Sequence, residues 1–118
     1  MVHVHERLRI LLEGDVITKE ASEIAAEAVD RLGIHAPQPQ IDMLVTHLAT
    51  ALTRMERGEA LEAPPEEMFK EVEHSSHIKD ANEEISWVEG RFGQSLPEEE
   101  QKFLKIHYVS IFQEMGGE

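Results

Sequence analysis

The sequence predicts an all-α protein, a compact helical bundle of five main helices with a short helix added at the amino terminus. Apolar residues recur at steps of three and four along most of the 118 residues, and no stretch alternates for long enough to indicate a β-strand. Hydrophobic residues make up 41% of the chain and charged residues 30%, but aromatic residues only 5%. This composition favours an ordered, aliphatic core over disorder or a β-sandwich, and the length suits one domain.

The first two helices are predicted from apolar spacing and from signals at their ends. Residues 5–13 carry leucines at helical spacing and stop at Gly14, a residue type that often ends helices in a left-handed conformation. Thr18 can cap the second helix through its side-chain oxygen, and Gly33 is expected to end it. The apolar positions of this second helix are Ala21, Ile24, Ala25, Ala28 and Leu32.

A proline-broken loop at residues 35–40 precedes a third helix that is expected from about Gln40 to Arg57. Gly58 and a pair of prolines then interrupt the chain, and residues 66–74 indicate a short fourth helix. The apolar stripe of the third helix is Ile41, Leu44, Val45, Leu48, Leu52 and Met55.

The fifth helix is predicted over residues 78–92, where a strict three-four alternation gives the narrow stripe of a helix that packs in a bundle. The sixth helix is expected to start at Pro97, because proline suits the first helical position and the three following glutamates favour the positive end of the helix dipole. Its apolar face is predicted to hold Leu104, Tyr108, Ile111 and Met115.

His107 lies inside that predicted apolar face, between Phe103 and Phe112. Burial of an imidazole costs free energy unless the ring is hydrogen-bonded. His107 therefore needs either a partner that satisfies it or a chemical role.

Charge and composition exclude several functions. Eleven basic against 24 acidic residues give a net charge of -13, which would repel nucleic acids and anionic membranes. The absence of cysteine removes disulfides, cysteine zinc sites and thiol nucleophiles. The amino terminus lacks the apolar core of a signal peptide, and no run approaches the roughly 18 apolar residues of a membrane span. We therefore expect a cytoplasmic protein, and no sequence motif indicates a cofactor.

Two segments of the chain resemble parts of a known family. Residues 96–107, LPEEEQKFLKIH, together with the preceding Phe92-Gly93, resemble the end of the PTS regulation domain (PRD). In residues 46–58, THLATALTRMERG, the histidine, arginine and glycine resemble its earlier histidine site. Two matches in the right order are far more specific than either alone. The resemblance makes residues 1–16 an N-terminal helical extension and residues 17–118 a PRD-like bundle.

The resemblance implies a stand-alone bacterial regulatory domain that is phosphorylated on histidine and is not an enzyme. Its phosphoacceptors would be His47 and His107, and its donors the phosphocarrier protein HPr and/or a IIB permease component of the phosphoenolpyruvate-dependent sugar phosphotransferase system. It would regulate carbohydrate uptake or transcription through a partner, commonly as a homodimer. Many family members carry an acid before the first histidine, where this chain has Thr46.

The residues around the two histidines can be interpreted without the family. His47 lies about 110° from the centre of its helix's apolar stripe, and Arg54 points within about 20° of the same direction, roughly 10 Å along the axis. A guanidinium there can support a phosphate. Glu100 is nearly in line with His107 and can orient its imidazole. The alternatives are a solvated surface pair on the third helix and a hydrogen-bonded core histidine on the sixth.

Two further functions remain open. A helical adaptor that has lost phosphorylation would bind a protein partner through its surface, and Thr46 favours that interpretation. A small metal-binding protein would use histidines near the chain start or between the fourth and fifth helices, with acids beside them. The residues concerned are His3, His5, His74, His77, Glu71 and Glu73.

Overall fold

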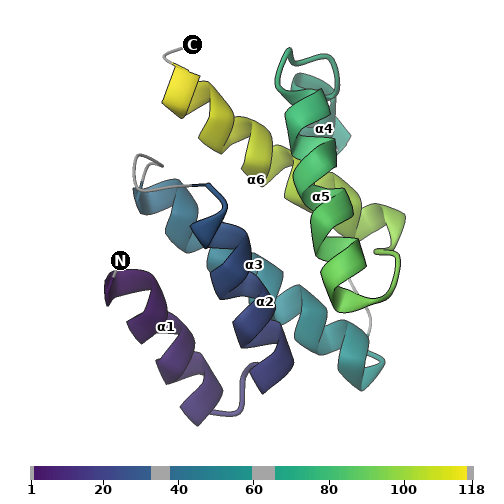
Figure 1. Ribbon diagram of the computed structural model, residues 1–118. Helices are drawn as coiled ribbons and strands as arrows, with labels where there is room; N and C mark the ends of the chain where they lie inside the picture. The colour runs from purple at the N-terminus through teal and green to yellow at the C-terminus, as the bar shows by residue number, and fades with distance from the viewer. Residues whose placement is uncertain (1, 33–37, 60–65, 117–118) are drawn as a thin grey trace. The chain divides into compact units, whose positions relative to one another are not determined.

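The computed structural model describes residues 2–32, 38–59 and 66–116, and within them all regular structure is helical. The prediction of an all-α fold is confirmed (Figure 1). The helices are α1 (Val2–Glu13), α2 (Lys19–Asp30), α3 (Gln38–Arg57), α4 (Glu66–Glu73), α5 (Ile78–Phe92) and α6 (Glu98–Gly116).

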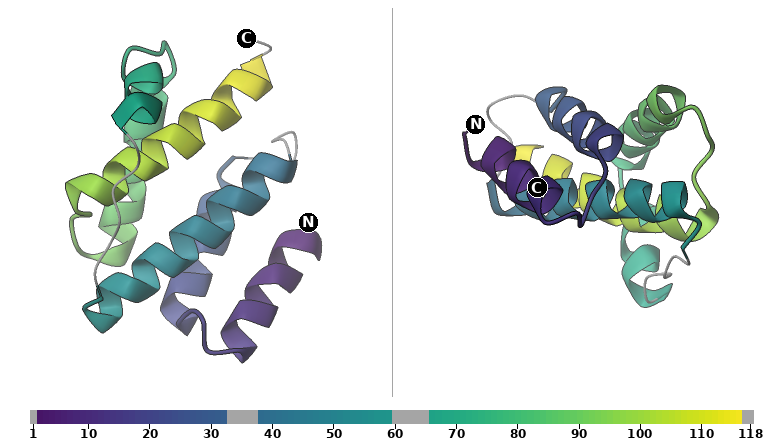
Figure 2. Two further views of the ribbon diagram at one scale, coloured as in Figure 1. Left: turned by 180° about the vertical axis from the view of Figure 1, so that it is seen from behind. Right: turned by 90° about the horizontal axis from the view of Figure 1, so that it is seen from below.

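The helices fall into two units. Unit 1 spans Met1–Leu61 and unit 2 spans Glu62–Glu118. In unit 1, α1, α2 and α3 all pack against one another, and Figure 2 shows α1 beside them from two further directions. In unit 2, α6 packs against both α4 and α5. The expected division into an extension, residues 1–16, and a domain, residues 17–118, stays a prediction.

The end of α1 differs from the expectation in one residue. Asp15, and not Gly14, has the left-handed conformation, with φ 60°. The Val16 N–H donates to the Leu11 carbonyl at 2.9 Å, which is the long bond of a Schellman motif. Aspartate tolerates a positive φ better than most residues, and Arg57 from α3 donates to the Asp15 carbonyl and carboxylate at 3.2 Å each. An ion pair therefore holds the end of α1 to the end of α3.

The buried face of α1 was predicted only in part. Leu8 is buried as expected, and Val4, one turn earlier, is buried as well. Leu11 is half-buried, and Leu12 is exposed. The stripe that packs on α2 and α3 therefore runs through Val4 and Leu8, because residues four apart lie on the same side of a helix.

The Thr18 side chain caps α2, as predicted. Its Oγ1 accepts from the Ala21 N–H at 3.2 Å, and its hydroxyl donates to Glu56 at 2.7 Å. The Thr18 N–H donates to Thr53 Oγ1 at 3.0 Å, so that the cap also joins α2 to α3. Helix α2 ends at Asp30 with Arg31 as its C-cap, before the predicted stop at Gly33, which itself lies outside the described residues.

The apolar stripe of α3 is confirmed, with the exception that Met55 is half-buried. The helix begins two residues before the expected Gln40 and ends at the expected Arg57. Gly58 follows with φ 70°, and the Glu59 N–H donates to the Arg54 carbonyl at 2.8 Å, which closes the end of the helix.

In unit 2, one carboxylate fixes the corner between α5 and α6. Gly93 ends α5 with φ 87°, and its N–H donates to the Glu89 carbonyl at 2.8 Å. The Glu89 carboxylate accepts from the Leu96 N–H at 2.7 Å and from Gln101 Nε2 at 3.1 Å. The last turn of α5 thus holds the chain that leads into α6.

The start of α6 lies one residue later than predicted. The Pro97 carbonyl accepts the first helical bond, from the Gln101 N–H at 2.9 Å, which makes Pro97 the capping residue and Glu98 the first helical one. Leu104, Tyr108 and Ile111 are buried as expected.

Met115 was predicted on that apolar face, but 42% of it is exposed. With 19 residues, α6 is longer than the helices of 15 and 8 residues that it packs against, and Met115 lies in its last turn. The apolar pattern therefore continues past the part of the helix that is best covered.

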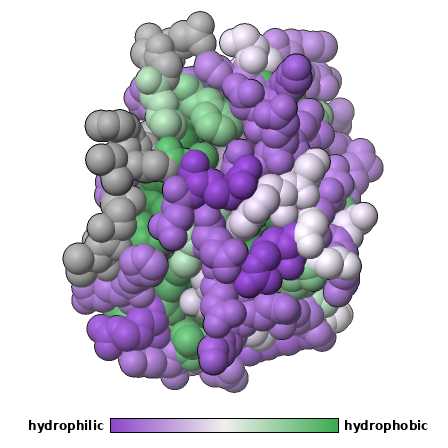
Figure 3. Space-filling model, viewed as in Figure 1, coloured by the Kyte–Doolittle hydropathy of each residue, from purple (hydrophilic) through white to green (hydrophobic). Residues whose placement is uncertain are grey.

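Most residues in view in Figure 3 are hydrophilic, as expected of a chain with a net charge of -13. None of the described helices combines the length and the low polarity that a membrane span requires.

Candidate functional site

His47 lies at the edge of the apolar stripe of α3, as predicted. Its side chain is half-buried. The next residue, Leu48, is fully buried, whereas Met43, one turn earlier on the side of His47, is 60% exposed. His47 therefore lies beside the fully buried stripe of α3 and is not part of it.

A threonine hydroxyl bonds back to the helix backbone at this position. Thr50 Oγ1 lies 2.9 Å from the Thr46 carbonyl oxygen and 3.0 Å from the His47 carbonyl oxygen, so its single proton is shared between them. Hydroxyls that bond back to the preceding turn relieve the backbone of part of its own hydrogen bonding and often bend the helix slightly.

Arg54 is exposed in the last turn of α3. Its side chain forms no ion pair or hydrogen bond with another described residue. The predicted support of a phosphate on His47 by Arg54 stays a prediction.

A second arginine, which sequence reasoning missed, reaches the helix beside His47. Arg7 from α1 donates from Nη1 to Thr46 Oγ1 at 3.4 Å, and its Nη2 lies 3.9 Å from Asp42 Oδ2. Asp42 also accepts from Gln38 at 2.9 Å. No sequence signal could have found this contact, because 39 residues separate Arg7 from Thr46 and only the packing of α1 on α3 brings them together.

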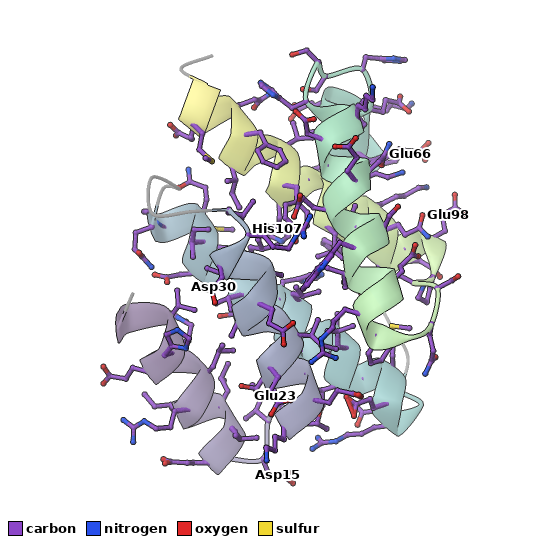
Figure 4. The ribbon with its side chains drawn as sticks, viewed as in Figure 1. Asp15, Glu23, Asp30, Glu66, Glu98 and His107 are labelled. Atoms are coloured by element: carbon purple, nitrogen blue, oxygen red, sulfur yellow. The ribbon has the colours of Figure 1, made fainter. Side chains whose placement is uncertain are left out.

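His107 lies on α6 and is half-buried (Figure 4). It is therefore not part of the fully buried core of α6, although its neighbour Tyr108 is.

Glu100, the predicted orienting carboxylate, is buried to 2% exposure two turns before His107. Glu98 and Glu99 are exposed, as expected for acids at a helix start. Burial of a carboxylate costs several kcal/mol unless it is well partnered, so Glu100 has a structural or functional role that its two neighbours do not share. Orientation of His107 by Glu100 stays a prediction.

Two lysines of α6 contact α4. The Nζ atoms of Lys102 and Lys105 are 5.3 Å and 5.7 Å from the centre of the Phe69 ring on α4. Lys102 also pairs with Glu98 at 3.6 Å. These cation–π contacts place positive charge on α6 in an otherwise acidic chain.

The two histidines belong to different units, His47 to unit 1 and His107 to unit 2.

The metal alternative gains no support from the described residues, where no three histidines or acids form a group that could hold an ion. His74 is exposed and pairs with Glu73 at 3.7 Å. His77 precedes the first residue of α5, and its ring lies 6.4 Å from that of Phe112.

Comparison with known proteins gives a family. The family model described as "PRD domain" matches residues 18–111, a range that contains both His47 and His107. The chain belongs to the PRD domain family. The match begins at Thr18, the N-cap of α2, so α1 lies before the part of the PRD domain that the family describes.

This PRD domain is also similar to "Uncharacterized protein YhfY" of Escherichia coli (strain K12), with 36% identity over 75 residues. The aligned region covers 60% of this chain and 62% of that relative, so the chain spans less than two thirds of the relative's length. No solved structure matches the chain significantly.

Proposed function

We propose that this PRD domain is a regulatory domain of the sugar phosphotransferase system that accepts phosphoryl groups on His47 and His107. The donors are HPr and/or a IIB permease component, and the phosphorylated state acts on carbohydrate uptake or transcription through a partner protein. In this role the domain is a substrate of phosphoryl transfer and not itself an enzyme.

The observation that carries the proposal is that the family match spans two histidines that are both half-buried. Phosphoryl transfer to histidine requires a neutral ring nitrogen that attacks the phosphorus atom of the donor. The new N–P bond forms while the donor's bond to phosphorus breaks, and the electron pair of that bond returns to the donor side chain. The imidazole must be accessible to the donor protein and must be held in position. A partly exposed imidazole on a helix meets both requirements.

The consequence of phosphorylation follows from charge. Each phosphohistidine adds roughly 1.5 to 2 negative charges, and the unmodified chain already carries -13. Repulsion by nearby acids and attraction to an arginine then shift the packing of the helix or of an interface between two copies.

The test is phosphorylation in a reconstituted system. The purified chain is incubated with phosphoenolpyruvate, the general phosphotransferase enzyme and HPr, with and without a IIB component, and its intact mass is measured at neutral and acid pH. We expect an acid-labile phosphate that maps to His47 and His107 and is lost from each site in His47→Ala and His107→Ala. Absence of label under both conditions contradicts the proposal, and a label that survives both substitutions contradicts the site assignment.

A non-phosphorylated adaptor is the second candidate, favoured by Thr46 at the position where many family members carry an acid. That function predicts no label, together with binding of a partner protein that His47→Ala and His107→Ala leave unchanged.

A further inference from the structure

Arg7 on α1 has hydrogen-bonding capacity that its present contacts do not use. Its bond to Thr46 is 3.4 Å long and its distance to the Asp42 carboxylate is 3.9 Å. Strong charge-assisted bonds of a guanidinium are about 2.7–2.9 Å long. The Arg7 Nε atom is buried and has no hydrogen-bond partner within the described part of the chain. The guanidinium is therefore held beside α3 by weak contacts.

The position of these contacts is next to the proposed phosphoacceptor. Thr46 immediately precedes His47, a rise of about 1.5 Å along the helix axis. Side chains of adjacent helical residues diverge by about 100°, so a phosphoryl group on His47 reaches Arg7 only if the arginine side chain swings across α3.

The surroundings allow that movement. The side chain of Arg7 is 41% exposed. It lines an open cavity of about 370 Å³ together with Glu6, Ile10 and Leu11. The flexible side chain of arginine therefore has open space beside it in which to change rotamer.

We propose that Arg7 is a ligand of the phosphoryl group on His47, and that α1 responds to phosphorylation through it; this inference rests on the proposed function. A phosphoryl group carries roughly 1.5 to 2 negative charges and three acceptor oxygens. It competes with the single charge of Asp42, which lies 3.9 Å from Arg7. The guanidinium moves from Asp42 and Thr46 to the phosphate and changes how α1 is attached to α3.

The proposal gives the N-terminal helix a function. α1 precedes the range that the family match covers, yet it packs on both α2 and α3. An arginine from α1 makes this helix part of the phosphorylation site, with a cation that does not come from α3 itself.

The test compares Arg7→Gln with Arg9→Gln, a matched control. Arg9 lies on the same helix and is 63% exposed, and among the described residues it pairs only within α1, with Glu13 at 3.6 Å. The full chain is phosphorylated, the donors are removed, and the lifetime of phosphate on His47 is followed by site-resolved mass spectrometry at neutral pH. We expect Arg7→Gln to shorten that lifetime roughly two- to fivefold, as for the loss of one partly exposed charge contact. Arg9→Gln is expected to leave it unchanged, and Arg7→Lys to restore part of it.

Asp42→Asn separates a phosphate ligand from a purely structural arginine. This change releases Arg7 from its ion pair and leaves an oxygen that can still accept from Gln38. A phosphate ligand predicts a longer lifetime of the label on His47 in Asp42→Asn. A purely structural role of Arg7 predicts a lower melting temperature in Arg7→Gln and in Asp42→Asn, with no change in the lifetime of the label on His47.

The outcomes are distinguishable from failure of the proposed function. Equal lifetimes in Arg7→Gln and Arg9→Gln, with normal labelling of His47, overturn the role of Arg7 and leave phosphorylation standing. Absence of label on His47 in the unmodified chain overturns both proposals.

Discussion

At the scale of single residues, three threonines hold the helices that carry the first candidate site. Thr18 begins α2 and reaches α3, Thr53 accepts the Thr18 N–H, and Thr50 bonds to the backbone at His47. Thr18 accepts from a backbone N–H at the helix start that has no partner within the helix. The hydroxyls of Thr50 and Thr53 bond back to carbonyls of α3 and compete with its backbone hydrogen bonds. The polar residues of unit 1 therefore determine where α3 lies against α2.

Thr18→Ala is expected to destabilise the protein by about 1–2 kcal/mol, because it removes the cap of α2. It also removes the hydrogen bond to Glu56. The measurement is urea unfolding followed by circular dichroism. Ser22→Ala, on the same helix, serves as control and is expected to change the free energy of unfolding by less than about 0.5 kcal/mol. Equal effects of the two substitutions would contradict a capping role.

Sequence reasoning at this scale succeeded for local interactions and failed for distant ones. The Thr18 cap was predictable, because donor and acceptor lie three residues apart. The contact of Arg7 with Thr46 spans 39 residues and leaves no local pattern. The sequence singled out Glu100 by its alignment with His107, but its burial was not predicted, because burial depends on how α6 packs.

At the scale of elements, the helix ends determine the lengths and directions of the helices. Gly58 and Gly93 adopt φ values of 70° and 87° at the ends of α3 and α5, a backbone conformation that residues with a Cβ atom rarely adopt. Asp15 has the same conformation at the end of α1 with φ 60°, which the sequence did not reveal because the neighbouring Gly14 is the more usual candidate.

Two glycines near the end of α5 provide an internal comparison. An added Cβ atom meets no atom within 4 Å at either Gly90 or Gly93, but only Gly93 has a positive φ. Gly93→Ala is expected to cost about 1 kcal/mol through backbone strain. Gly90→Ala is expected to stabilise the protein by about 0.5–1 kcal/mol, because alanine favours a helix interior.

The measurement is the midpoint of urea unfolding for the two variants and the unmodified chain. Neither added methyl group meets steric hindrance. Opposite signs of the change in the free energy of unfolding for the two variants would therefore report only the difference in backbone conformation between the two positions. A stabilising Gly93→Ala would show that α5 does not end in a left-handed residue.

At the scale of the whole molecule, charge is the dominant property. The chain carries -13, and ion pairs such as Arg9 with Glu13 and Lys102 with Glu98 lie at the surface. Such pairs contribute little to stability. Repulsion among the remaining acids opposes the folded state. Each phosphoryl group would increase this repulsion.

Salt is therefore expected to stabilise the protein. Raising sodium chloride from about 0.05 M to about 0.5 M shortens the Debye length from about 14 Å to about 4 Å and screens that repulsion. We expect the melting temperature to rise, by circular dichroism at constant pH. Sucrose at the same osmolality is the control for effects that do not depend on charge. A melting temperature that falls with salt would show that attractive pairs outweigh the repulsion.

The sequence by itself determined the class of fold, the positions of the helices and the family resemblance, because each of these is encoded in local spacing. Periodicity of 3.6 residues, capping residues and glycines act over a few positions of the chain. The two histidine segments were recognisable for the same reason, and the match over residues 18–111 confirmed the family.

Only the tertiary structure decided which polar groups meet. The packing of α1 on α3 brings Arg7 to Thr46, and Glu100 is buried whereas Glu98 and Glu99 beside it are exposed. Burial and long-range contacts depend on which helix faces pack together, and the spacing of residues within one helix does not show which neighbour covers it. The role proposed for Arg7 at His47 therefore rests on a contact that the local sequence could not reveal.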